Sequence, residues 1–227
     1  MPNQITLCLT IGNRPEPLEK TLRSLLPQIK FDHIIAINDF RDSPTNEMFR
    51  QLCPNGTLIN LPEQVGHHKA VDAMYKLVKT KYVFHCEDDW LFEGDIPIQS
   101  ILNLLNAKSE LSEICLRRVE DIPMSEEEKS KILTCEGLDL QYKRLDPLHE
   151  QWHGYTFNPH IASLDNWRML GGFHQFKKER HVSRHFRGRG MHVAYLTPGY
   201  CSHIGDGISV SIKPTRLDRM KNWFSNL

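Results

Sequence analysis

The chain has 227 residues, of which 40% are hydrophobic and 25% charged, a composition typical of a globular protein. Lysine and arginine number 28 against 28 aspartate and glutamate, so the overall charge predicts no nucleic-acid partner. No apolar run is long enough to span a bilayer, and the N-terminal stretch lacks the basic start of a signal peptide. The six cysteines are dispersed without a CxxC pair, which favours reduced thiols and a cytoplasmic protein.

The first half of the chain alternates predicted strands with predicted helices. Apolar runs predict strands at 5–11, 33–39, 57–63, 81–86 and 113–119. Apolar residues at helical spacing predict helices at 15–26, 46–53, 66–79 and 98–105. This alternation is typical of βαβ units, so we expect an α/β fold with a mostly parallel central sheet flanked by helices.

The second half has a less regular pattern. Residues 120–132 are polar and predict a solvated helix or a loop, whereas 152–164 are aromatic and resemble a strand. A short helix closed by glycines is expected at 166–173 and a last strand at 192–197. No linker composition divides the chain, so we expect one domain over residues 1–212 followed by a tail at 213–227.

Polar side chains follow three of the predicted strands at the points where these strands end. In an open α/β sheet, ligands bind beyond the carboxyl ends of the strands. Each cluster alone has a simpler explanation as a helix cap or a turn, but together they predict one crevice. The residues are Asn13 and Arg14 after the first strand, Asn38 and Asp39 after the second, and Glu87, Asp88 and Asp89 after the strand at 81–86.

The three adjacent acids need compensating positive charge, because neighbouring carboxylates repel one another. Mg²⁺ and Mn²⁺ suit carboxylate ligands, and they commonly keep positions open for phosphate oxygens and water. The cluster therefore predicts half of a site for Mn²⁺ or Mg²⁺ with a nucleotide diphosphate. An exposed acidic turn is the alternative, and the apolar Trp90 and Leu91 that follow disfavour it.

These motifs resemble the GT-A fold glycosyltransferases of the family-2 type, with Glu87-Asp88-Asp89 as an EDD variant of the family's DxD motif. The stretches that carry the resemblance are "LCLTIGNRPEPLEKTLRSL", "IIAINDF" and "VGHHKAVDAMY", and more loosely "FNPHIASLDNWRMLGGF". The resemblance implies a single GT-A-like (Rossmann-like) domain. Residues 1–110 would bind the nucleotide sugar, and 111–212 would bind the acceptor.

The resemblance also implies roles for individual residues. The loop of Thr10, Asn13 and Arg14 would lie near the nucleobase, and Asp39, with Asn38 beside it, would contact uracil. Gly66 and Lys69 would lie near ribose and phosphate. Asp89 would bind the metal directly, Glu87 and Asp88 would orient ribose or metal-bound water, and His203 would bind metal or diphosphate. Glu179 would be the catalytic base. The family usually has an acidic pair at this place and this chain has only Glu179, so Asp165 and Asp206 are the alternatives for the role.

Three further patterns each have two interpretations. His181 and His185 are spaced for zinc on a helix but equally suit a solvated helix. A run of basic residues could hold phosphate of the donor or of a lipid-diphosphate acceptor, or balance the acids at 126–128. Its members are Lys177, Lys178, Arg180, Arg184, Arg187 and Arg189. The tail at 213–227 is basic and amphipathic, and it either contacts a membrane peripherally or packs on the domain.

We therefore expect a metal-dependent glycosyltransferase that moves a sugar from a UDP-linked donor to a hydroxyl of a glycan or lipid-linked glycan, with inversion. One alternative is a sugar nucleotidyltransferase, although "TIGNRPEP" has less glycine than the loop that opens such enzymes. The other alternative is a non-catalytic module that binds nucleotide or glycan in the same crevice.

Overall fold

The computed structural model describes residues 4–205. The apolar runs of the first half of the chain form a parallel sheet. Strand β1 (Ile5–Ile11) pairs in parallel with β2 (His33–Asn38) on one side and with β4 (Tyr82–Glu87) on the other. The short β3 (Thr57–Ile59) pairs in parallel with β2 at the sheet edge. The carboxyl ends of β1, β2 and β4 therefore lie at one edge of the sheet.

The sheet continues through the second half of the chain in the order β3-β2-β1-β4-β9-β6-β10-β8-β7. Strands β8 and β9 run against the other seven, since their pairings are antiparallel and the rest follow one direction. The expected α/β fold with a mostly parallel central sheet is confirmed. The added strands are β6 (Leu111–Cys115), β7 (Leu133–Gly137), β8 (Leu140–Arg144), β9 (His160–Ser163) and β10 (His192–Thr197).

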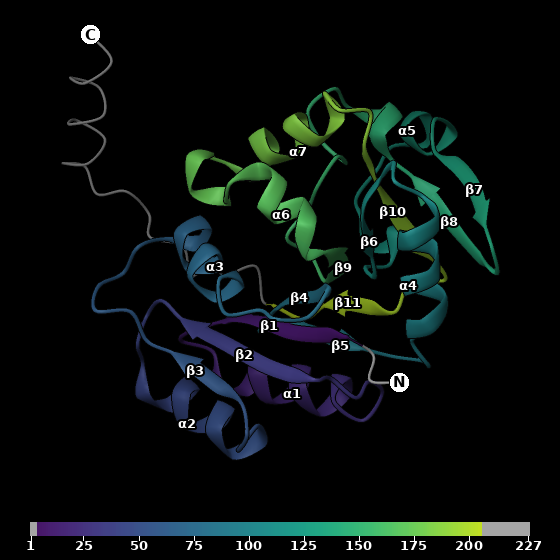
Figure 1. Cartoon of the computed structure of the whole chain (residues 1–227). Helices are drawn as coiled ribbons and strands as arrows, with labels where there is room; N and C mark the ends of the chain where they lie inside the picture. The colour runs from purple at the N-terminus through teal and green to yellow at the C-terminus, as the bar shows by residue number, and fades with distance from the viewer. Residues whose placement is uncertain (1–3, 206–227) are drawn as a thin grey trace, which may run out of the picture.

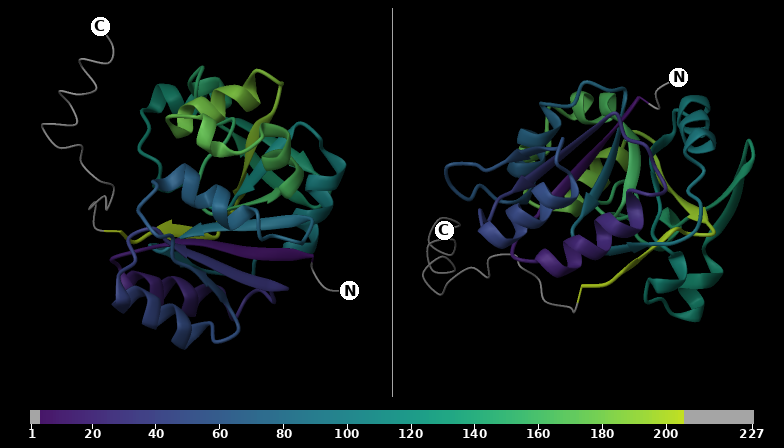
Figure 2. Two further views of the ribbon diagram at one scale, coloured as in Figure 1. Left: turned by 60° about the vertical axis from the view of Figure 1, so that its left-hand side comes forward. Right: turned by 90° about the horizontal axis from the view of Figure 1, so that it is seen from below.

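Helices cover both faces of the sheet (Figures 1 and 2). One face packs against α1 (Pro15–Leu25), α2 (Ser43–Leu52) and α4 (Ile98–Ala107). The other face packs against α3 (His67–Tyr75), α6 (Leu164–Leu170) and α7 (Glu179–Arg187). The five-residue α5 (Glu126–Ser130) buries no side chain, which agrees with the solvated helix expected there.

Strand β1 contributes side chains to the cores on both faces of the sheet. Successive side chains of a strand point to opposite sides. Leu7 and Leu9 accordingly pack with the helices of the first face, whereas Cys8 between them packs with those of the second. All six cysteines are unpaired, as expected.

Apart from shifts at the ends of predicted elements, the structure differs from the sequence prediction in three places. The segment at 152–164 is a strand only over its last residues, because Pro159 has no amide to donate to a neighbouring strand and the amide of Asn158 bonds to the Thr156 hydroxyl. The β7–β8 hairpin was not anticipated. Neither was a second sheet, in which β5 (Trp90–Phe92) pairs with β11 (Cys201–His203).

The tail at 213–227 and Asp206 lie outside the described residues, so the predictions made for them remain predictions. Among residues 4–205, no helix combines the length and the apolar character that crossing a membrane requires.

Candidate active site

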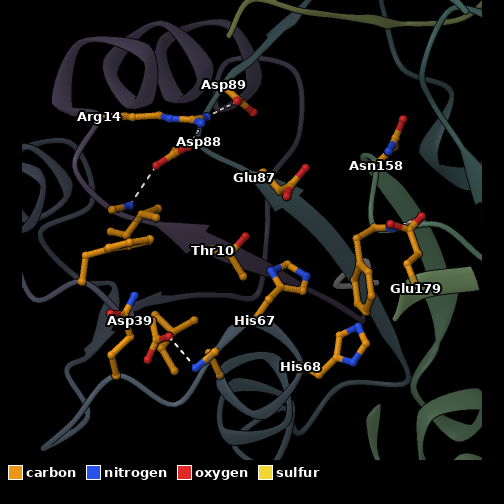
Figure 3. Close-up of a pocket in the computed structure, with 18 of the residues that line it drawn as sticks. Thr10, Arg14, Asp39, His67, His68, Glu87, Asp88, Asp89, Asn158 and Glu179 are labelled. Carbon is orange, nitrogen blue, oxygen red and sulfur yellow. Dashed lines mark hydrogen bonds and ion pairs between the residues drawn. The ribbon is translucent and has the colours of Figure 1, made fainter. Parts of the chain in front are cut away.

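The ends of β1, β2 and β4 open onto one cavity of about 710 Å³. Register places Thr10 of β1 beside Ile37 of β2 and Glu87 of β4, so the three strands end at the same level. Figure 3 shows the labelled residues arranged around this space. Of the predicted site residues, those that line the cavity are Thr10, Arg14, Asp39, Gly66, Glu87, Asp88, Asp89, Glu179 and His203.

Asp39 fixes the loop that leads into α3. Its two carboxylate oxygens accept hydrogen bonds from the amides of Val65 (2.9 Å) and Gly66 (2.8 Å). Gly66 has a φ of 85°, a backbone conformation that glycine adopts without the strain of a side chain. A carboxylate oxygen can accept more than one hydrogen bond, and Asp39 lines the cavity, so it can also accept a hydrogen bond from a ligand.

Asn38, in contrast, is occupied by the protein itself. Its side chain accepts from the amides of Phe40 and Arg41 and donates to the side chains of Asp42 and Asn46. It is fully buried and does not line the cavity. The structure thus gives Asn38 the turn-building role that was the simpler explanation.

Two other predicted residues also lie away from the cavity lining. Asn13 is exposed, and its amide donates to Asp42 Oδ2 at 2.8 Å. Lys69 is exposed on α3.

The acidic cluster forms one wall of the cavity. Asp88 Oδ2 accepts a hydrogen bond from the Gly12 amide at 2.8 Å. Arg14 pairs with Asp89 and lies 3.6 Å from Asp88 Oδ1. His203 Nε2 lies 3.1 Å from Asp89 Oδ2, because the β5–β11 pairing brings residues 201–203 alongside Trp90.

Burial and the neighbouring carboxylates make Glu87 and Asp88 reluctant to ionise. Burial raises the pKa of Glu87 to about 8, and the neighbouring Asp89, Glu179 and Asp88 add to the effect. Burial raises the pKa of Asp88 to about 7, and Asp89 adds to this, although the Gly12 amide and Arg14 oppose it. A cation bound here would relieve this repulsion.

The geometry of Asp89 and His203 fits a shared divalent cation. Two ligands at neighbouring corners of an octahedron around Mg²⁺ lie ~3 Å apart, since each is ~2.1 Å from the ion. The 3.1 Å between Asp89 Oδ2 and His203 Nε2 matches that separation. Gly205 leaves room for the pair, because a Cβ there would lie 2.6 Å from Asp89 Oδ2. Within residues 4–205, no three His, Cys, Asp or Glu side chains gather closely enough to hold a metal unaided, so other ligands would have to come from substrate and water.

Glu179 lies on the opposite wall from Arg14 and the aspartates, next to Asn158 (Figure 3). It is the first residue of α7, and its Oε1 accepts from the Phe157 amide at 3.4 Å. Burial raises its pKa, while hydrogen bonds from the Thr156 hydroxyl and the Phe157 amide counteract that rise. The alternative acid Asp165 does not line the cavity; it is exposed and pairs with Arg168.

The sequence prediction missed several cavity residues. His67 and His68 begin α3, and the His67 ring packs edge-on against Phe157 with centroids 4.5 Å apart. Phe157 and Asn158 complete the wall beside Glu179. The sequence signal for Phe157 and Asn158 was their place in the "FNPH" stretch, and that for His67 and His68 was their place in "VGHHKAVDAMY".

A family model described as glycosyl transferase family 2 matches residues 6–191, which include all the cavity residues named above except His203. The chain belongs to glycosyl transferase family 2. No curated protein sequence gives a significant match.

Solved structures share the fold of this family-2 chain. A mannosyltransferase, PcManGT from Pyrobaculum calidifontis in complex with GDP-Man and Mn²⁺, is 13% identical with a TM-score of 0.60, covering 85% of this chain and 56% of its own. Residues 1–349 of S. aureus TarS are 12% identical to this chain, with a TM-score of 0.60. The match covers 88% of this chain and 60% of the TarS chain. A longer S. aureus TarS structure is 10% identical, with a TM-score of 0.61. The match covers 90% of this chain and 37% of that TarS chain. The chain thus spans about half the length of these proteins, and the likeness establishes the GT-A fold.

Proposed function

We propose that this family-2 glycosyltransferase moves a sugar from a UDP-linked donor to a hydroxyl of a glycan or lipid-linked glycan, using Mn²⁺ or Mg²⁺ and inverting the anomeric centre. The observation that carries this proposal is one cavity with Asp89 and His203 on one wall and Glu179 on the other. PcManGT, which has the same fold, was solved with GDP-Man and Mn²⁺. That complex supports a nucleotide-sugar donor and a divalent cation for this chain.

We call the side of the cavity that carries Asp39, Arg14, Asp89 and His203 the donor wall. This wall suits a uridine diphosphate. Uracil offers one ring N–H, and Asp39 keeps an acceptor position for it while its oxygens hold Val65 and Gly66. Arg14 supplies positive charge beside the acids, and a guanidinium can bind phosphate oxygens through two parallel hydrogen bonds. Asp89 and His203 would hold the metal, which neutralises negative charge on the departing diphosphate.

We call the opposite side of the cavity, with Glu179, Phe157 and Asn158, the acceptor wall. This wall supplies the base. A hydroxyl that attacks the anomeric carbon must lose its proton, and the Glu179 carboxylate is positioned to take it. The new bond joins the acceptor oxygen to the anomeric carbon, the bond from that carbon to the phosphate oxygen breaks, and UDP leaves with the electron pair. A single displacement of this kind inverts the anomeric centre.

The test is a thermal-unfolding panel with UDP and GDP, each with and without Mn²⁺, on the wild type and on Asp89→Asn. A ligand that binds only the folded state raises the unfolding temperature. We expect a shift with UDP that depends on Mn²⁺ in the wild type and is absent in Asp89→Asn. Equal Mn²⁺-dependent shifts in both proteins would contradict the metal assignment, and a larger shift with GDP would contradict the choice of uridine.

A further inference from the structure

Helix α7 and the two residues before it present a row of basic side chains to solvent. Lys177, Lys178, Arg180 and Arg184 are exposed, and we call these four the α7 basic row. Arg180 and Arg184 lie one turn apart on the same side of the helix. Glu179, the one acid among residues 177–189, lines the cavity.

The α7 basic row is not balanced by the acids at 126–128, which was one interpretation of the sequence. Glu126 pairs with Lys129 and Glu127 with Lys131, while Glu128 forms a capping box with Ser125. Within residues 4–205, no member of the α7 basic row forms an ion pair. The positive charge is therefore available to a partner.

This arrangement costs the protein stability. Like charges at the spacing of Arg180 and Arg184 repel, and cations at the beginning of a helix oppose its dipole. Partial burial lowers the pKa of His181, and so do the surrounding Arg180, Arg184, Lys178 and Lys177. Arg187 on the same helix differs, because it donates to the backbone oxygens of His149 and Trp152.

The position of the α7 basic row associates it with the acceptor. Lys178 and Arg180 flank Glu179 in the chain, and Glu179 lies across the cavity from Arg14 and the aspartates that face the donor phosphates (Figure 3). Glu179 is the first residue of α7 and lines the cavity, so a molecule that presents a hydroxyl to it lies beside the beginning of this helix.

We propose that the acceptor is an anionic glycan carrying phosphate groups, and that Lys177, Arg180 and Arg184 bind phosphates next to the sugar whose hydroxyl reaches Glu179. This inference rests on the proposed function, since it names the acceptor class of the same site. Guanidinium groups match phosphate oxygens in shape and charge. A membrane-binding helix would expose apolar residues between its basic ones, whereas α7 buries Val182 and Phe186 in the core.

Labelled sodium polyphosphate is a suitable probe, because it offers a chain of phosphates without a sugar. We compare the full-length wild type with the triple variant Lys177→Gln/Arg180→Gln/Arg184→Gln by fluorescence anisotropy. The variant should bind the probe at least about tenfold more weakly and show a shallower dependence of affinity on salt, because fewer phosphates are neutralised. The matched control Lys20→Gln/Arg23→Gln/Arg50→Gln removes the same charge from α1 and α2, on the opposite face of the sheet, and should change the affinity less than about twofold.

Three outcomes would overturn the proposal. The first is an unchanged affinity in the α7 triple variant when its unfolding temperature matches that of the wild type. The second is a loss in Arg14→Gln as large as in the triple variant, because polyphosphate would then occupy the donor wall. The third is a triple variant that loses sedimentation with phosphatidylglycerol vesicles but keeps its polyphosphate affinity, which would identify a membrane as the partner. Failure of Mn²⁺-dependent UDP binding would instead overturn the proposed function, and the polyphosphate measurement requires neither donor nor metal.

Discussion

At the scale of single residues, Glu179 depends on its surroundings to act as a base. Burial raises the pKa of its carboxyl, whereas the Thr156 hydroxyl and the Phe157 amide stabilise the ionised form. A base must be ionised before it takes a proton, and a raised pKa makes it a stronger acceptor.

Replacing Glu179 by Gln should keep the shape of the acceptor wall but remove the proton acceptor. We expect turnover to fall by about a hundredfold or more, with little change in donor affinity. Initial rates and the UDP thermal shift measure the two effects separately. The control Glu150→Gln changes an exposed glutamate outside the cavity and should leave both unchanged. A Glu179→Gln enzyme with more than half of the wild-type turnover would assign the base to another residue.

At the scale of elements, α7 is held close to the segment that carries Phe157 and Asn158. The Gly154 amide donates to Ser183 Oγ at 2.8 Å. A Cβ at Gly154 would lie 2.2 Å from the Ser183 carbonyl oxygen and 2.5 Å from Arg187 Cγ. Only glycine allows this approach, so the position of Glu179 at the beginning of α7 depends on it.

Gly154→Ala should therefore push α7 away from the neighbouring segment. We expect a loss of about 1 to 3 kcal/mol in the free energy of unfolding, as for an overpacked core, and a lower turnover because Glu179 moves. Gly188→Ala is the matched control. Gly188 has a helical φ of −61°, and a Cβ there would make only ordinary contacts, so this variant should keep its stability or gain a few tenths of a kcal/mol. Urea unfolding and initial rates check both variants, and equal stabilities would show that the contact is not tight.

At the scale of the whole molecule, a buried polar cluster couples folding to pH. Glu113 of β6 is fully buried, accepts from the Thr156 amide at 2.8 Å, and has its other oxygen 3.6 Å from His160 Nε2. Burial lowers the pKa of His160 to about 4, so this histidine is neutral at pH 7. Burial also raises the pKa of Glu113 well above 4.5, and nearby Glu179 adds to the rise while the Thr156 amide opposes it. Glu113 is therefore held in its neutral form.

The sign of the resulting pH dependence follows from this raised pKa. Above about pH 4.5 the carboxyl ionises in the unfolded chain but stays protonated in the folded one, so the free energy of unfolding decreases as the pH rises towards the folded-state pKa. Glu113→Gln lacks this contribution and can still accept from Thr156. Its stability relative to the wild type should increase with pH, by up to about 1.4 kcal/mol per pH unit. Denaturant unfolding between about pH 5 and pH 7 measures the difference. Parallel curves for the two proteins would contradict the buried neutral carboxyl.

The sheet of the first half and the part of the donor wall that this sheet carries follow from local patterns in the sequence. Strands β1, β2 and β4 are local apolar runs, and parallel strands end at a common edge, so Thr10, Asp39 and the acidic cluster meet without further information. The same reasoning misplaced Asn38, because a residue at a strand end can point inwards as well as outwards. Its burial depended on Asp42 and Asn46, which receive its hydrogen bonds.

Contacts between distant segments bring His203 to the donor wall and build the opposite wall around Glu179. His203 reaches Asp89 from 114 positions along the chain because β11 pairs with β5, a pairing between two short strands with no local signal. Asn158 lines the cavity because its segment leaves the strand pattern, and the Thr156 and Phe157 amides bond to Glu113 and Glu179. Contacts between distant segments depend on packing and on hydrogen bonds that both partners must satisfy, whereas the period of an apolar run is set by its own residues.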